Sequence, residues 1–148
     1  MPISRDRTSS PGRTEQGLAL ALFLLTVVLF WPATGCDYMN LDDYPYVRDN
    51  PMVWGGVTPD GIRQAFSTVR EQWWLPLLWI SYMADIAVFG PGPHGHHLAN
   101  VLLHAANAAL LFWVLFRMTG SRWRSAFAAA LFAWHPLRME SVAWITER

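Results

Sequence analysis

The sequence predicts an all-α membrane protein, a polytopic helical bundle with an external loop that carries short interface helices. Of its 148 residues, 53% are hydrophobic and only 15% are charged, whereas a typical soluble domain has roughly 25% charged residues. The apolar residues gather in long runs, and all eleven basic residues are arginine. A formal net charge of zero argues against nucleic-acid binding. A single cysteine excludes a disulfide framework.

The first predicted span is residues 17–36, which contain no charged residue and follow a polar tail, residues 1–16. Twenty helical residues are about 30 Å long, which matches the hydrocarbon core of a bilayer. A basic flank, an apolar run and small residues before Cys36 also describe a cleavable secretory signal, and these residues resemble a weak lipoprotein box. Because further spans follow, we favour an uncleaved helix.

Residues 37–95 are predicted to form an external loop, since they carry seven acidic and three basic residues. Arginines gather instead in the tail before the first span and in the segment 117–124. An excess of positive charge marks the cytoplasmic side of a membrane protein. We therefore expect a multi-pass protein of the inner (plasma) membrane with a cytoplasmic N-terminus.

Two short helices are expected within this loop, at about 59–70 and 76–89. The first begins after Thr58, a capping hydroxyl residue followed by proline, and Ile62 and Phe66 recur at helical spacing. The second is apolar, but its fourteen residues extend only about 21 Å as a helix. This length is too short to cross a bilayer and suits a helix that lies in the membrane interface.

The later predicted spans are residues 96–116 and 125–144, joined by a cytoplasmic turn at 117–124. Residues 96–116 contain neither an acid nor an arginine and would be about 31 Å long as a helix. Pro136 interrupts the last span, so that its helix either kinks there or breaks near the outer surface.

Polar residues line one face of the predicted helix 96–116. They recur at steps of three, four and three residues: His97, Asn100, His104 and Asn107. Within a membrane, such a face should point into the bundle or towards a water-filled cavity. Interhelical hydrogen bonding and a functional lining both remain open.

Two groups of residues could carry chemistry. Asp42 and Asp43 lie in a stretch expected to be extended, where neighbouring side chains point opposite ways and only one carboxylate faces a given site. Such a carboxylate could act as a general base towards a hydroxyl. His94, His96 and His97 could contribute metal ligands, but no further ligand lies at suitable spacing. We therefore expect no metal to be held by these histidines.

Four segments taken together resemble one family, in their order and spacing, from about Phe30 to Arg148. They are LDDYPYVRDNP (41–51), WWLPLLWISYMAD (73–85), HGHHLANVLLHAANAALL (94–111) and ALFAWHPLRMESVAWITER (130–148). These segments are similar to the amino-terminal part of bacterial TMTC-like proteins, the transmembrane and tetratricopeptide-repeat O-mannosyltransferases. One departure is Leu75, which stands where the family has histidine.

The resemblance implies the N-terminal part of a GT-C fold that transfers a mannose-like sugar from a polyprenyl-phosphate donor to an acceptor protein at the external membrane face. It implies that Asp42 and Asp43 form the acidic catalytic motif, and we favour Asp43 as the base. Four further residues are expected near the site as substrate-binding residues: His96, His97, Glu140 and Arg148. No cofactor is implied with certainty, and a divalent metal remains open.

The family continues with further spans and then tetratricopeptide repeats. We therefore expect this chain to be an N-terminal fragment of a membrane glycosyltransferase that is inactive alone. Two other interpretations remain: a small noncatalytic membrane scaffold or assembly protein, and a histidine-based metal-binding membrane protein. The expected partners are the lipid bilayer, the lipid-linked donor and the acceptor protein.

Overall fold

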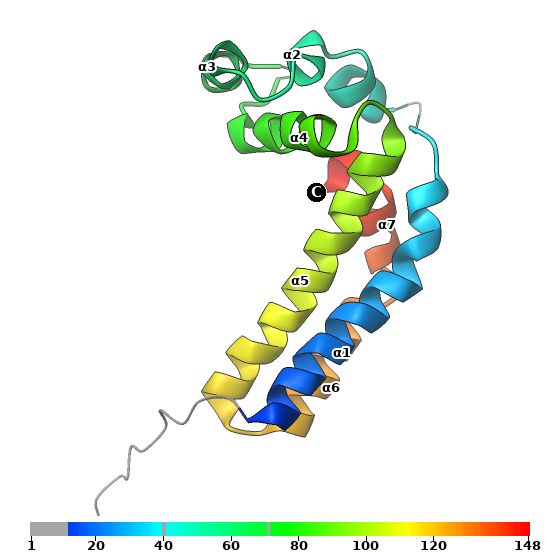
Figure 1. The fold of residues 1–148 in the computed structure, drawn as a ribbon, viewed down its shortest axis with the longest axis vertical. Coiled ribbons are helices and arrows are strands. Elements are labelled where there is room, and N and C mark those ends of the chain that lie inside the picture. Colours follow the sequence, from blue (N-terminus) through cyan, green and yellow to red (C-terminus); the bar gives the residue numbers. More distant parts are fainter. Residues whose placement is uncertain (1–11, 40, 71) are drawn as a thin grey trace, which may run out of the picture.

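The computed structural model describes residues 12–39, 41–70 and 72–148, and its regular structure there is helical, which confirms the predicted all-α class. The elements in chain order are α1 (Arg13–Phe30), η1 (Trp31–Gly35), η2 (Tyr44–Arg48), α2 (Pro51–Trp54), α3 (Pro59–Ser67), α4 (Pro76–Phe89), α5 (Pro93–Thr119), α6 (Arg122–Trp134), α7 (Arg138–Ala143) and η3 (Ile145–Glu147). Helices α1, α5 and α6 form an elongated bundle, and η2 with α2–α4 forms a cap at one end of it (Figure 1).

Small side chains allow the helices of the bundle to approach closely. The buried alanines are Ala19 on α1, Ala105 and Ala108 on α5, and Ala129 and Ala133 on α6. Helix α5 runs antiparallel to α1 and α6 (Figure 1). Its Phe112 packs with Ala19 and Ala129. Close approach through small residues is typical of helices that pack within a membrane.

Two helices of the described residues are long and apolar enough to cross a membrane. They are Arg13–Gly35, which includes η1, and Pro93–Thr119, and they contain the predicted spans 17–36 (apart from Cys36) and 96–116. Helix α6 has only 13 residues and ends at Trp134, so the chain breaks before Pro136 rather than kinking. That 125–144 crosses the bilayer stays a prediction.

The cap helices begin much as the sequence predicts. The Thr58 hydroxyl accepts a hydrogen bond from the Gly61 N–H at 3.1 Å and starts α3, which ends at Ser67 rather than near residue 70. Helix α4 has the predicted bounds 76–89. Ile62 and Phe66 are the apolar residues whose helical spacing predicted α3, and both are exposed in the structure.

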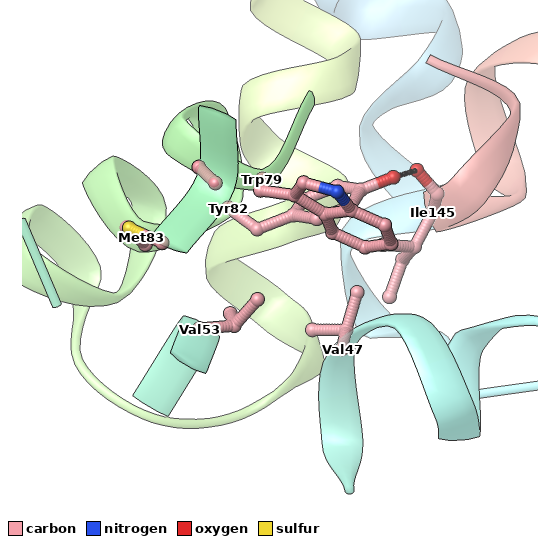
Figure 2. Packing of buried hydrophobic residues seen from close by; sticks show 7 residues of the cluster. Val47, Val53, Trp79, Tyr82, Met83 and Ile145 are labelled. Carbon is pink, nitrogen blue, oxygen red and sulfur yellow. Dashed lines mark hydrogen bonds between the residues drawn. The ribbon is translucent and has the colours of Figure 1, made fainter. Parts of the chain in front are cut away.

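The cap has its own hydrophobic core, shown in Figure 2. Its buried members come from η2, α2, α3, α4 and η3: Val47, Val53, Ala65, Trp79, Tyr82, Met83 and Ile145. Ile145 comes from the last residues of the chain, which return past α7 to the cap beside α4 and α5 (Figure 1). The C-terminal segment therefore joins the cap to the bundle.

Candidate active site

Buried polar side chains gather where the cap meets the bundle. They come from the segment before η2, from α4 and from the first turns of α5: Asp43, Asp85, His96, His97 and Asn100. The C-terminal segment 144–148 supplies partners to most of them. Because buried polar groups are costly unless they are paired, the contacts of each are informative.

Asp43 is fully buried, and both of its carboxylate oxygens accept hydrogen bonds. Oδ2 accepts from the backbone N–H of Met39 at 2.9 Å, and Oδ1 accepts from the Thr146 hydroxyl at 3.1 Å. Asp42, in contrast, is exposed. The structure therefore places one of the two candidate carboxylates in the buried group and leaves the other at the surface.

The predicted extended conformation of this segment is wrong. Asp43 has helical dihedral angles, φ −61° and ψ −30°, and leads into the π-helical turn η2, with Pro45 in its first turn. The Tyr46 N–H donates to the Asp42 carbonyl at 3.0 Å at the start of this turn, and the Asp49 N–H closes it by donating to the Tyr44 carbonyl at 2.8 Å. Proline fits the first turn of a helix as well as it fits extended backbone, so Pro45 did not discriminate between them.

Asp85 pairs with both His96 and Arg148. Its Oδ2 lies 2.8 Å from His96 Nδ1 and 2.7 Å from Arg148 Nη2. All three side chains are nearly excluded from solvent, with 9% of Asp85, 1% of His96 and 10% of Arg148 exposed. One negative charge thus lies between a permanent cation and an imidazole in a buried site.

Arg148 uses its whole guanidinium within the chain. Nε donates to Asn100 Oδ1 at 2.6 Å, and Nη1 donates to the Ser81 hydroxyl at 3.0 Å. Nη2 also donates to the backbone carbonyl of His96 at 3.1 Å. The guanidinium lies over the Tyr82 ring, 5.0 Å from its centroid. Arg148 therefore joins α4 to α5.

The backbone just before Arg148 is held by the same two helices. Asn100 Nδ2 donates to the Trp144 carbonyl at 3.0 Å, and the Tyr82 hydroxyl donates to the Ile145 carbonyl at 3.4 Å, as Figure 2 shows. Burial raises the pKa of the Tyr82 hydroxyl, Arg148 opposes this effect, and Asp43 adds to it. The neutral phenol therefore remains the donor in this contact.

The four predicted substrate-binding residues separate into two groups. His96, His97 and Arg148 are buried or nearly so, whereas Glu140 is exposed on α7. Neither ring nitrogen of His97 makes a hydrogen bond of good geometry with the described residues, although the backbone groups of Asp37 and Ala143 are near enough to interact with the ring. Glu140 contributes only its backbone carbonyl, which accepts from the Trp144 N–H at 3.0 Å.

Sequence reasoning did not select Asp85, Asn100 or Thr146 as site residues. A usable signal existed for two of them: Asp85 lies four residues after Ser81 on the predicted helix 76–89, and Asn100 belongs to the polar face of α5. Thr146 had no such signal, because only the return of the C-terminal segment brings it to Asp43.

A cavity of about 250 Å³ opens beside Arg148, between α5, α6 and α7. It is lined by Asn100, Leu103, His104, Asn107, Phe132, Arg138, Ser141, Glu147 and Arg148. Three of the four polar residues predicted to share one helix face therefore line a cavity. Its polar lining contains two arginines, two amides, a histidine, a serine and one acid, Glu147, beside two apolar residues.

In the described part of the chain, no three His, Cys, Asp or Glu side chains form a group able to hold a metal ion. His94 Nδ1 lies 2.8 Å from the Thr34 carbonyl, whereas His96 Nδ1 faces Asp85. The neighbouring histidines are thus directed to separate partners.

Comparison with known proteins shows distant homology to TMTC protein O-mannosyltransferases. Protein O-mannosyl-transferase Tmtc1 of Drosophila melanogaster is 39% identical to this chain over 75 residues, which are 51% of the chain and 9% of that protein. Protein O-mannosyl-transferase TMTC2 of Homo sapiens is 37% identical over 73 residues, 49% of the chain and 9% of that protein.

A third relative aligns with nearly the whole chain. Protein O-mannosyl-transferase F38B6.6 of Caenorhabditis elegans is 27% identical over an aligned length of 161 residues, gaps included. The alignment covers 97% of this chain but 22% of that protein. The chain thus spans only a small part of the curated relatives it matches. No family model and no solved structure matches the chain.

Proposed function

We propose that this chain is the N-terminal part of a GT-C-type membrane glycosyltransferase that transfers a mannose-like sugar from a polyprenyl-phosphate donor to protein hydroxyls at the external membrane face. The homology to O-mannosyltransferases supports the reaction class. The observation that carries the proposal is the buried Asp43 carboxylate, held by Thr146 next to the group formed by Asp85, His96 and Arg148.

In this proposal Asp43 is the general base. An ionised carboxylate offers about four lone-pair positions, and the Met39 N–H and the Thr146 hydroxyl occupy two of them. Asp43 is fully buried in this structure, so the proposal requires the acceptor to displace part of its cover. The remaining lone pairs could then orient the acceptor hydroxyl and take its proton as the sugar is transferred. The two internal hydrogen bonds fix the orientation of the carboxylate, which lowers the entropy lost on reaching the reactive geometry.

The donor phosphate would bind in the cavity between α5, α6 and α7. Arg148 lines this cavity, but its charge is already balanced by Asp85. Arg138, which also lines the cavity and stacks 4.7 Å from the Phe132 ring centroid, is the more available cation. A guanidinium in this position can offset the charge of the departing phosphate. Nothing in the placement of Glu140 supports a role in binding.

The test is sugar transfer from polyprenyl-phosphate mannose to a Ser/Thr-containing peptide, in membranes that contain the longer parent protein of which this chain is proposed to be a part. We expect Asp43→Asn to abolish transfer while membrane insertion and donor binding are retained, because the isosteric amide keeps the volume but removes the base. The matched variant Asp42→Asn changes the adjacent, exposed carboxylate and should transfer at near the wild-type rate. Wild-type transfer by both variants would exclude the proposed base.

A noncatalytic scaffold is the second candidate, and one observation favours it. Both Asp43 oxygens and all three Arg148 nitrogens make hydrogen bonds inside the chain, as in a purely structural network. For a scaffold, Asp43→Asn should lower the midpoint of thermal unfolding, and the wild-type parent protein should show no sugar transfer in the same assay.

A further inference from the structure

The two nitrogens of the His96 imidazole have different surroundings. Nδ1 lies 2.8 Å from the Asp85 carboxylate, whereas Nε2 is buried and has no hydrogen-bond partner among the described residues. A buried ring nitrogen without a partner is unfavourable. The Asp85 contact, in contrast, is short and well defined, so the ring orientation is set from one side only.

Hydrogen-bond chemistry determines which nitrogen carries the proton. An ionised carboxylate can only accept, so Nδ1 must be the nitrogen that donates. In the neutral ring, Nε2 then carries a lone pair and is an acceptor. Arg148 already balances the charge of Asp85 at 2.7 Å, so a positive imidazole is not needed for charge balance.

Another histidine on α5 has the opposite arrangement. His104 Nε2 lies 2.9 Å from the Ala133 carbonyl, which also can only accept, so the neutral ring of His104 carries its proton on Nε2. Two histidines on one helix thus differ in tautomer because their partners differ. For His96, the partner that sets the tautomer is Asp85.

We propose that Asp85 is a positioning residue that holds His96 with its Nε2 lone pair ready to accept a hydrogen bond from a substrate hydroxyl. This inference rests on the proposed function, in which both the sugar donor and the acceptor side chain present hydroxyls. A substrate hydroxyl would donate to Nε2 and supply the partner that the protein itself does not.

Two aromatic rings lie beside the imidazole of His96: Tyr82, with its ring centroid 5.7 Å away, and Tyr38. The ring centroid of Tyr38 lies 6.4 Å from that of His96, and the Tyr38 hydroxyl is buried without a partner among the described residues. Tyr38 lies in a short segment outside the helices and is itself only half-buried. Because His96 is fully buried, the proposal requires a side chain beside it to move before a ligand reaches Nε2, and Tyr38 is the neighbour that lies outside the helices.

The first test is the tautomer of His96, measured by ¹⁵N NMR of the full chain with labelled histidine, in lipid nanodiscs at about pH 8, where rings of ordinary pKa are neutral. We expect His96 to show a protonated Nδ1 and an unprotonated Nε2, and His104 to show the reverse in the same spectrum. A protonated His96 Nε2 in the wild-type protein would overturn the inference.

Variants then test whether Asp85 sets this state. We expect Asp85→Ala to shift His96 towards the Nε2-protonated form while the His104 signals stay unchanged. Asp85→Ala/Arg148→Met removes both charges and should give the same shift without leaving a buried unpaired cation. An unchanged His96 tautomer in the folded double variant would show that Asp85 does not position the ring.

Ligand additions test the hydroxyl and identify its source. We expect either short-chain polyprenyl-phosphate mannose or a Ser/Thr peptide to shift the His96 Nε2 resonance, and His96→Gln to weaken binding of that ligand about fivefold. No shift with either ligand, or an equal shift caused by Tyr38→Phe alone, would overturn the inference. This test and the transfer assay can fail independently of each other. A ligand-induced shift of the His96 resonance without sugar transfer would exclude only the proposed reaction.

Discussion

Asp85 and Arg148 form a buried ion pair in which each charge depends on the other. Their side chains are about one-tenth exposed, and the two charged groups lie 2.7 Å apart. Loss of one partner leaves an uncompensated buried charge, which costs about 3–5 kcal/mol. We therefore expect Asp85→Ala to lower the free energy of unfolding by about 3 kcal/mol, measured by denaturant titration in detergent micelles.

An exposed pair in the same chain provides the matched control. Arg48 and Asp49 lie 3.8 Å apart and are 47% and 64% exposed, so solvent screens their attraction. Asp49→Ala should change the free energy of unfolding by less than about 1 kcal/mol. Equal effects of Asp85→Ala and Asp49→Ala would show that the buried network does not stabilise the fold.

Tyr82 predicts a loss of stability at alkaline pH. Burial raises the pKa of its hydroxyl in the folded state above the ordinary value of 10.0. Below that value both states keep the proton, and above it the unfolded state ionises first, so the free energy of unfolding falls as pH rises. We expect Tyr82→Phe to fall less steeply than wild type between about pH 10 and 11.5 in chemical denaturation curves.

Tyr38 offers a second comparison for this alkaline effect. Burial also raises its pKa, with contributions from Asp43 and Asp37, but its side chain is only half-buried. Tyr38→Phe should therefore flatten the alkaline decline less than Tyr82→Phe does. Identical slopes in wild type and both variants would contradict this assignment.

At the scale of elements, α5 holds the bundle together through small residues. Ala105 is fully buried, whereas the adjacent Ala106 is exposed. A larger side chain at the buried position must displace its neighbours, which costs about 1–3 kcal/mol. We expect Ala105→Leu to lower the midpoint of thermal unfolding, measured by circular dichroism in micelles, and Ala106→Leu to leave it nearly unchanged. A similar decrease in both variants would argue against close packing here.

The end of α6 shows how the tertiary structure chose between two predicted outcomes. Pro136 allowed either a kink or a break, and both are compatible with the sequence. A break leaves carbonyls at the end of α6 without helical partners. His104 of α5 donates to one of them, that of Ala133, at 2.9 Å. His104, on the polar face of α5, thus stabilises the break in the helix. The sequence around Pro136 does not contain this information.

The turn around Asp43 could not be predicted for a related reason. Pro45 is compatible with both extended and helical backbone, so the local pattern was ambiguous. The Asp43 carboxylate at the start of the observed turn accepts from the Met39 N–H and from the hydroxyl of Thr146, which lies 103 residues further along the chain. A contact between residues this far apart has no local sequence signal.

Over the whole molecule, the bundle exposes large apolar side chains. Leu24, Val28, Leu110 and Phe127 are each more than half exposed. Such an outward surface is unfavourable in water and suits contact with lipid tails. Its two ends differ, because the N-terminus of α1 and the α5–α6 turn lie at one end and the cap at the other (Figure 1). Which of these ends faces the cytoplasm stays a prediction.

Orientation in the membrane can be tested by cysteine labelling. In a Cys36→Ser background, a membrane-impermeant maleimide added from outside should label Gln64→Cys, an exposed cap position. Ser121→Cys, in the turn between α5 and α6, should react only after the membrane is permeabilised. The reverse pattern would invert the topology and place the candidate site on the cytoplasmic side.

The sequence by itself determined the helical class, the two long apolar helices and the bounds of α4, because these depend on composition, length and local signals such as Pro76 and the glycines after Phe89. It also identified Asp43, His96, His97 and Arg148 as chemically notable residues. Only the tertiary structure decided which of them meet, and it added Asp85, Asn100 and Thr146. The physical reason is that the C-terminal segment returns to the cap, and a hydrogen bond or ion pair between distant segments depends on that return rather than on local sequence.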